Sequence, residues 1–189
     1  MSSSKLCFLT VGATASFSEL IEAAVSPAFL TALESQGYTE LSVQYGQDGQ
    51  QLFEKCKTVA QGTSKLKVTG FDLDKLGLGK HMRRAKGGKD ADEGVVISHA
   101  GSGSILDALR TGVPLIVVPN ETLLDNHQVE LAEALAEQEY VVHGRLPQLP
   151  KALADAEKLR QRAKEWPPVN SGPERGLKGI LDDEMGFLD

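Results

Sequence analysis

The chain has 189 residues, 41% of them hydrophobic, which is enough for one well-buried core, so we expect one domain followed by a tail. Its 26 acidic and 20 basic residues give a formal net charge of -6, which lacks the overall basic character of nucleic-acid binders, so we expect no nucleic-acid partner. The two cysteines, Cys7 and Cys56, show no disulfide pattern, and the start of the chain does not resemble a signal peptide. No apolar run approaches the roughly 20 residues that are needed to cross a bilayer. We therefore expect a cytosolic protein.

The first part of the chain alternates short apolar runs with segments of helical periodicity. An apolar run at 6–11 ends at Gly12, and residues 17–33 then show helical spacing that is broken near Pro27. The expected elements that follow are a strand at 41–45, a helix at 50–59 and a strand at 66–71.

Residues 72–93 interrupt this alternation because they are polar and rich in glycine. We expect a long loop or a ragged helix there, in a polar region that extends to about residue 94. We assign no role to its basic side chains, which are Lys80, Arg83, Arg84, Lys86 and Lys89.

Regular alternation returns after the polar region. The expected elements are strands at 95–98, 115–118 and 140–142 and helices at 102–111, 126–138 and 151–164. Pro167 and Pro168 stop the last helix. Because strands alternate with helices, we predict an α/β fold with a Rossmann-like parallel sheet and flanking helices over residues 1–165, and a tail over 166–189.

A glycine-rich motif lies where the strand at 95–98 meets the helix at 102–111. It consists of Ser98-His99-Ala100-Gly101-Ser102-Gly103-Ser104. Free backbone N–H groups and the helix dipole favour an anion at such a junction, so we predict a diphosphate site. An ordinary tight turn is one alternative. A dinucleotide site is another, which the sequence disfavours because Leu106 stands where the third glycine of that fingerprint would be.

Asp107 stands eight positions after His99 and one helical turn beyond Ser104. A carboxylate there can accept hydrogen bonds from both hydroxyls of a ribose whose phosphates lie at the helix start. We predict a ribose contact, with a solvated helix charge as the alternative.

A second polar cluster follows the strand at 115–118 and its Pro119–Asn120 turn. It consists of Asp125, Asn126, His127 and Gln128. In a parallel sheet this loop emerges at the same edge as the glycine-rich motif. The short polar groups suit the hydroxyls of a hexose, and helix capping by Asp125 or Asn126 is the alternative.

Together these residues resemble the donor-binding half of GT-B glycosyltransferases. Plant members of that fold use a His-x-Gly-x-x-Ser run with an acidic residue eight positions after the histidine, followed later by Asp-x-x-Gln. The matching residues are His99, Gly101, Ser104, Asp107, Asp125 and Gln128. Over residues 5–142 the chain resembles the family of cytosolic UDP-GlcNAc-binding subunits of two-chain N-acetylglucosaminyltransferases. The segments that carry this resemblance are 8–14, 44–46, 96–104, 117–120 and 125–128.

The resemblance implies transfer of GlcNAc from UDP-GlcNAc to dolichol-diphosphate-GlcNAc, with inversion to a β1,4 linkage, in the second step of lipid-linked N-glycan assembly. It implies no cofactor besides this donor substrate. It also implies a heterodimer with a membrane-anchored, acceptor-binding subunit, and recruitment to the cytosolic face of the endoplasmic reticulum membrane. The length supports a partner, because a whole GT-B enzyme needs two Rossmann-like units and this chain has elements for one.

By the same resemblance a set of residues binds UDP-GlcNAc. The set is Gly12, Ala13, Thr14, His99, Gly101, Ser102, Gly103, Ser104, Asp107, Asn120, Asp125, Asn126, His127 and Gln128. Ala13 stands where the family commonly has threonine. His99 and the helix start would stabilise UDP as it departs. The sequence does not identify the general base. It has no evident cluster of carboxylates that would bind a metal, so we expect no protein-bound ion.

Three other functions stay open. A UDP-sugar epimerase would need both halves of the fold in one chain. A serine hydrolase built on Ser98 and His99 is disfavoured because adjacent strand residues point to opposite faces of the sheet. A non-catalytic nucleotide-sugar-binding or scaffold protein would bind UDP without transferring sugar.

The tail contains apolar residues that fall along one face of a short helix: Leu177, Ile180, Leu181, Met185 and Leu188. A helix this short is marginal alone in water, so its apolar stripe must pack on something. We predict that it docks on the membrane-anchored partner, and the alternative is that it folds back on its own domain.

Overall fold

Six strands form one parallel sheet in the computed structural model, which describes residues 3–13, 16–62, 64–122 and 127–165. The strands are β1 (Ser4–Thr10), β2 (Glu40–Gln44), β3 (Lys67–Phe71), β4 (Ala91–His99), β5 (Leu115–Val118) and β6 (Val142–His143). They lie in the order β3-β2-β1-β4-β5-β6, and every neighbouring pair is parallel. Parallel strands need crossover connections, which the helices supply.

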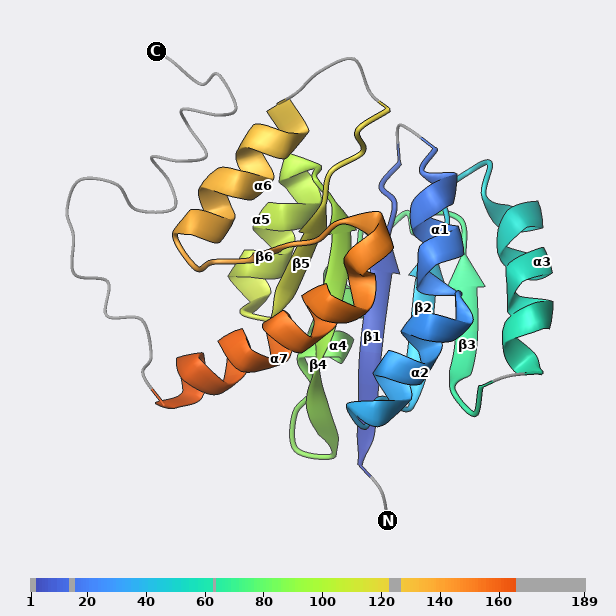
Figure 1. Ribbon diagram of the computed structural model, residues 1–189, viewed down its shortest axis with the longest axis horizontal. Coiled ribbons are helices and arrows are strands. Elements are labelled where there is room, and N and C mark those ends of the chain that lie inside the picture. Colours follow the sequence, from blue (N-terminus) through green and yellow to red (C-terminus); the bar gives the residue numbers. More distant parts are fainter. Residues whose placement is uncertain (1–2, 14–15, 63, 123–126, 166–189) are drawn as a thin grey trace.

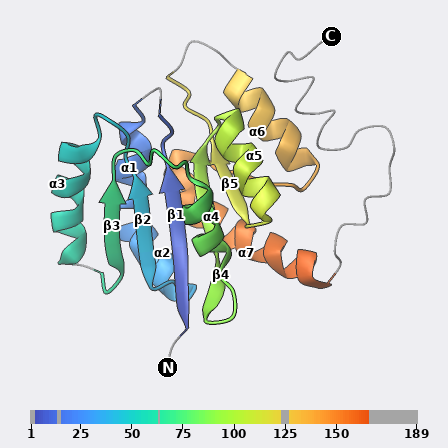
Figure 2. The ribbon, with the colours of Figure 1, turned by 180° about the vertical axis from the view of Figure 1, so that it is seen from behind.

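Helices cover both faces of the sheet (Figures 1 and 2). One face carries α1 (Ser18–Ala24), α2 (Pro27–Ser35), α3 (Gln50–Gln61) and α7 (Leu149–Glu165), which follows a short 3-10 turn at Leu146–Gln148. The other face carries α4 (Gly79–Lys86), α5 (Ser102–Thr111) and α6 (His127–Glu137). The central strand β1 is apolar on both sides because Cys7 and Leu9 enter the first core and Leu6 and Phe8 the second. The predicted α/β class with a parallel sheet is confirmed.

Several element boundaries match the sequence expectation. The helix at 102–111 and the strand at 115–118 have the expected bounds. The helical segment at 17–33 is divided into α1 and α2, as Pro27 predicts. Ser26 caps α2, since its hydroxyl accepts a hydrogen bond from the N–H of Phe29 at 3.3 Å, and Pro27 occupies the first helical turn, where no partner for its nitrogen is needed.

The polar region at 72–94 is more ordered than a long loop. It contains α4, whose Met82 and Ala85 are fully buried in the core against α5 and the sheet. Leu78, at the start of α4, packs against the same core. These three apolar positions, spaced four and three apart, form a narrow helical stripe, which the surrounding basic residues and glycines obscure in the sequence.

The strand β4 begins at Ala91, four residues before the expected start. Its register with β1 shifts between Lys5 and Cys7, and Gly94 lies at this irregularity. A Cβ on Gly94 would lie 1.8 Å from the carbonyl oxygen of Leu6, so no side chain fits there. The glycine and the polar residues before it hide a strand that pairs closely with β1.

A group of polar side chains attaches α7 to the amino-terminal edge of the sheet. Glu157 of α7 accepts hydrogen bonds from Lys5 Nζ at 3.0 Å and from the Tyr38 hydroxyl at 2.7 Å, and it forms an ion pair with Arg160. Lys5 also donates to the backbone carbonyl of Gln36 at 3.0 Å. No helix among the described residues, α7 included, has the length and apolar character to cross a bilayer.

We expect Glu157→Gln to lower the free energy of unfolding by about 3 kcal/mol, because it replaces the carboxylate that pairs with the largely buried Lys5 and Arg160 side chains by a neutral amide. Urea denaturation followed by circular dichroism measures the change. Asp155→Asn is the matched control on the same helix: Asp155 pairs with Lys158 on the exposed surface, so its loss costs less than about 1 kcal/mol. Equal effects of the two substitutions would contradict the assigned role of Glu157.

Candidate functional site

The described residues of the predicted site lie at the end of β4, in the loops that follow β1, β4 and β5, and in the helices α5 and α6 that two of these loops lead into. All three strands run in one direction, so these loops emerge at the carboxyl edge of the sheet. In open parallel sheets ligands bind at this edge, where neighbouring loops lead to opposite faces. Here the helices after β1 lie on one face and the helix after β4 lies on the other (Figures 1 and 2).

The ring of His99 is packed between two glycines. A Cβ on Gly12 would lie 2.4 Å from His99 Cε1, and a Cβ on Gly101 would lie 2.1 Å from His99 Nε2. Gly12 also has a φ of 83°, which disfavours any other residue. The structure therefore brings three predicted site residues from two loops into direct contact.

Burial lowers the pKa of His99, and the backbone of Thr10 acts on it in the opposite direction. Because burial has the larger effect, the imidazole is more fully neutral at pH 7 than an exposed histidine. Its Nδ1 is buried without a hydrogen-bond partner among the described residues. His99 is thus suited to hydrogen bonding as a neutral ring rather than to supplying a positive charge.

The helix α5 begins immediately after this contact. Gly101 is its N-cap residue, and no side-chain oxygen caps the first turn. A Cβ on Gly103 would meet nothing within 4 Å, so the space beside the first turn is open. Ser102, Gly103 and Ser104 thus form an uncapped helix start, which is suited to an anion by its free N–H groups and its dipole.

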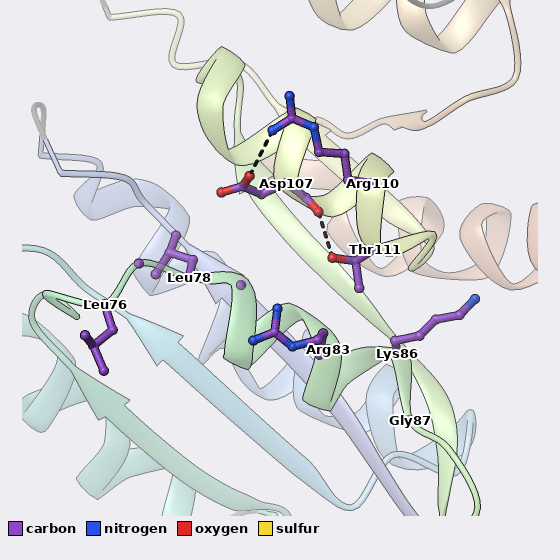
Figure 3. Close-up of a pocket in the computed structure, with 10 residues that line it drawn as sticks. Leu76, Leu78, Arg83, Lys86, Gly87, Asp107, Arg110 and Thr111 are labelled. Carbon is purple, nitrogen blue, oxygen red and sulfur yellow. Dashed lines mark hydrogen bonds and ion pairs between the residues drawn. The ribbon is translucent and has the colours of Figure 1, made fainter.

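A cavity of about 730 Å³ lies between α4 and α5 (Figure 3). Asp107, Arg110 and Thr111 line it from α5, while Arg83 and the segment 76–79 line it from the opposite side. The Asp107 side chain is 49% exposed, and its carboxylate lies 3.7 Å from the guanidinium of Arg110. Asp107 therefore combines access to solvent with a position on the cavity wall.

Hydrogen bonds of Asp74 fix the cavity wall formed by segment 76–79. Its carboxylate lies 2.7 Å from Lys80 Nζ and 2.8 Å from His81 Nε2, and it accepts a hydrogen bond from the N–H of Leu76 at 3.0 Å. Hydrogen bonds from Lys80 and His81 hold the pKa of Asp74 well below its usual range. The His81 ring also stacks on Phe71, with centroids 4.3 Å apart. Sequence reasoning missed this wall because it left the polar region without a role.

At the loop after β5, two predicted site residues form hydrogen bonds with other groups of the protein. Asn120 is 4% exposed, and its Oδ1 accepts hydrogen bonds from the N–H and hydroxyl of Thr122 at 3.2 and 2.7 Å. Its N–H donates to Gln128 Oε1 at 3.1 Å. Asn120 and Gln128 therefore shape this loop, which borders a second cavity of about 450 Å³ with Phe17.

Of the remaining predicted residues, one lies at a cavity, one is exposed, and the others are outside the part of the chain that the structure describes. Ala13 lies beside Gly12 at a small cavity near Tyr45, and His127 is exposed on the first turn of α6, 3.6 Å from Glu130. Several predicted residues lie outside the described residues: Thr14, Asp125, Asn126, Leu177, Ile180, Leu181, Met185 and Leu188. In the part of the chain that the structure describes, no three His, Cys, Asp or Glu side chains are grouped to hold a metal ion.

Comparison with known proteins gives a family match. The model of the glycosyltransferase family 28 C-terminal domain matches residues 6–171. A protein of Cryptococcus neoformans named UDP-N-acetylglucosamine transferase subunit ALG13 is 34% identical over 198 residues, covering 95% of this chain and 96% of that protein. The protein of that name from Yarrowia lipolytica is 37% identical over 137 residues, covering 72% of this chain but 63% of its own length.

Two solved structures are similar to the chain. A solution NMR structure of ALG13 has a TM-score of 0.60 and 30% sequence identity, with 86% of this chain and 87% of that chain covered. The crystal structure of Acinetobacter baumannii MurG has a TM-score of 0.57 and 20% identity, covering 85% of this chain and 46% of that chain. The second likeness concerns the fold alone.

The contact between Gly12 and His99 predicts a measurable coupling. We expect Gly12→Ala to lower the free energy of unfolding by about 2–3 kcal/mol, since it adds a clash with the ring to the cost of a positive φ. In a His99→Ala background the same change should cost at least about 1 kcal/mol less. Urea denaturation of the four proteins in this double-mutant cycle measures the difference.

Gly37→Ala is the control for backbone strain alone, because Gly37 has a φ of 77° and a Cβ there would meet nothing within 4 Å. Its cost should be about 1 kcal/mol in both backgrounds. A zero coupling between positions 12 and 99 would contradict the packing of His99 against Gly12.

Proposed function

The chain belongs to the glycosyltransferase family 28 C-terminal domain family, and on that basis we propose that it is the donor-binding subunit of a heteromeric inverting N-acetylglucosaminyltransferase. Its donor is UDP-GlcNAc, its acceptor is dolichol-diphosphate-GlcNAc, and its product is the β1,4-linked chitobiosyl lipid. The observation that carries the proposal is the continuity from the Gly12–His99–Gly101 contact, through the uncapped start of α5, to Asp107 on the cavity wall. The relatives' shared name, UDP-N-acetylglucosamine transferase subunit, supports the choice of donor.

The donor is placed along α5. Its diphosphate lies at the first turn, near Ser102 to Ser104, where N–H groups and the helix dipole favour negative charge. Its ribose hydroxyls donate hydrogen bonds to Asp107, one turn further on. The nucleobase then enters the cavity between α4 and α5, whose volume of about 730 Å³ is in the range of small-molecule sites. Leu76 and Leu78 give that cavity apolar surface for a planar ring.

The reaction is one in-line displacement at the anomeric carbon. The acceptor hydroxyl oxygen forms the new bond, its proton goes to a general base, and the bond from the anomeric carbon to the phosphate oxygen breaks, leaving UDP with the electron pair. Negative charge grows on the diphosphate as it departs. The start of α5 stabilises that charge through its N–H groups, and His99 contributes as a neutral imidazole that holds Gly12 and Gly101 in place.

The acceptor half of the enzyme comes from a membrane-anchored partner at the cytosolic face of the endoplasmic reticulum. The name that the relatives share supports a partner, because it calls each of them a subunit of a transferase. The apolar tail residues from Leu177 to Leu188 dock on the partner and hold this chain at the membrane.

We expect Asp107→Ala to weaken UDP-GlcNAc binding by about 1.5 to 3 kcal/mol, because it removes a charged hydrogen-bond acceptor from the ribose. Alanine preserves the helix. Titration calorimetry on the whole chain with its partner measures the change. Glu133→Ala is the control, because it removes an exposed carboxylate that lies in the middle of α6. This variant should bind the donor as tightly as the natural chain does. Unchanged affinity in a folded Asp107→Ala chain would rule out the ribose contact.

The docking function of the tail predicts that a chain ending after Pro168 loses its partner and keeps its fold. Copurification with the membrane-anchored partner and donor binding by the truncated chain are measured side by side. Donor binding should persist, because α5 and the cavity lie upstream of the cut. Full-strength copurification by the truncated chain would show that the docking proposal is wrong.

A further inference from the structure

The side chain of Gln44 connects three strand ends at the carboxyl edge of the sheet. It is 1% exposed. Its Oε1 accepts hydrogen bonds from the Thr10 hydroxyl at 2.5 Å and from the Gly12 N–H at 3.2 Å. Its Nε2 donates to the carbonyl oxygens of Gly12 at 3.0 Å and of Asp72 at 2.7 Å. Two donors face the amide oxygen and two acceptors face the amide nitrogen, so the orientation of the amide is determined by its partners.

These bonds join two loops that belong to strands on opposite sides of β2. Gly12 follows β1, and Asp72 follows β3. Backbone hydrogen bonds reinforce the same edge, since the N–H of Val11 donates to the carbonyl of Gln44 and the N–H of Tyr45 donates to the carbonyl of Phe71. The Gln44 amide thereby sets the separation between the loop after β1 and the loop after β3.

Each of these loops leads to one part of the proposed donor site. Gly12 touches the ring of His99, which in turn touches Gly101 at the start of α5. Asp72 leads through Asp74 to the segment 76–79, which lines the cavity opposite Asp107. Gln44 therefore lies behind both the diphosphate end and the nucleoside end of the donor site.

We propose that Gln44 is a positioning residue for the donor: it holds the loops after β1 and β3 at the spacing at which the start of α5 and the cavity wall bind one UDP-GlcNAc together. This inference rests on the proposed function. A glutamine is required because the site needs two donors and two acceptors on one planar group. Methionine has a similar length but leaves the carbonyls of Gly12 and Asp72 unbonded, and glutamate directs oxygen toward both carbonyls.

The test uses membranes from cells in which the Gln44→Met or Gln44→Glu chain replaces the natural one. Transfer from UDP-GlcNAc to dolichol-diphosphate-GlcNAc is measured over a range of donor concentrations. We expect KM for UDP-GlcNAc to rise by about tenfold or more, and kcat to change less, because donor binding depends on the spacing of the loops. A purely structural role would instead lower kcat per total chain, through loss of folded enzyme, and leave KM unchanged.

Val43→Ala is the matched control. Val43 precedes Gln44 in β2, and its side chain is fully buried in the first core, together with Cys7 and Leu9. The substitution therefore weakens the same strand without removing a hydrogen bond to either loop. Its KM should stay within about twofold of the natural chain. If Gln44→Met and Gln44→Glu both leave KM unchanged, or if Val43→Ala raises KM equally, the positioning role is overturned.

Amide hydrogen exchange on the purified chain tests Gln44 without any ligand. Gln44→Glu should speed exchange selectively at Gly12, Leu76 and Gly77, whereas Val43→Ala should affect the sheet more evenly. Should the natural chain fail to bind or transfer UDP-GlcNAc, the proposed function falls while this exchange pattern still decides whether Gln44 holds the two loops. Unchanged exchange at all three amides would overturn the inference whatever the activity.

Discussion

The parallel pairing of β1 with β2 on one side and β4 on the other determines the rest of the structure. Thr10 lies opposite both Gln44 and Ser98 in the two ladders, so three strands end at nearly the same level. Because the strands run in one direction, their following loops meet at one edge. Residues far apart in the chain, Gly12 and His99 among them, come into contact for this reason. The glycines on either side of His99 then allow the loops to approach more closely than any other residue would permit.

The charged residues of the polar region divide into two groups with different roles. Lys80, Arg84 and Lys86 pair with Asp74, Glu40 and Glu93 respectively, and these pairs attach α4 to its loop and to the sheet. Arg83 instead lines the cavity between α4 and α5, which Lys86 and, from α5, Arg110 also border. Pairing with carboxylates thus explains most of this cluster of cations in an acidic chain. What remains at the cavity is a small number of donors beside the Asp107 carboxylate.

The sequence was most informative where glycine or proline coincides with a change of periodicity. The bounds of α5 and β5 and the break at Pro27 follow from such positions. It was least informative where the deciding partner is distant along the chain. The early part of β4 is specified by the fit of Gly94 against Leu6, and α4 by two buried residues among many cations.

The candidate site shows the same division. The motif from Ser98 to Ser104 and its relation to Asp107 are local in sequence, and the structure places them along one helix beside a cavity. The burial of His99, the internal bonding of Asn120 and the four bonds of Gln44 depend on residues brought together by the sheet. A pattern in one sequence identifies the residue types at such positions but not the partners that satisfy them.

The bond between Lys5 and Glu157 joins positions 152 residues apart and links the first strand to the last described helix. During synthesis on the ribosome, β1 emerges first, yet its partner β4 and its support from α7 are made much later. The apolar surface on both sides of the central strand β1 therefore stays partly uncovered while the rest of the chain is translated. Distant pairing of this kind slows folding and prolongs exposure of apolar surface. The order of the elements along the chain thus leaves apolar surface of β1 uncovered until β4 and α7 have been made.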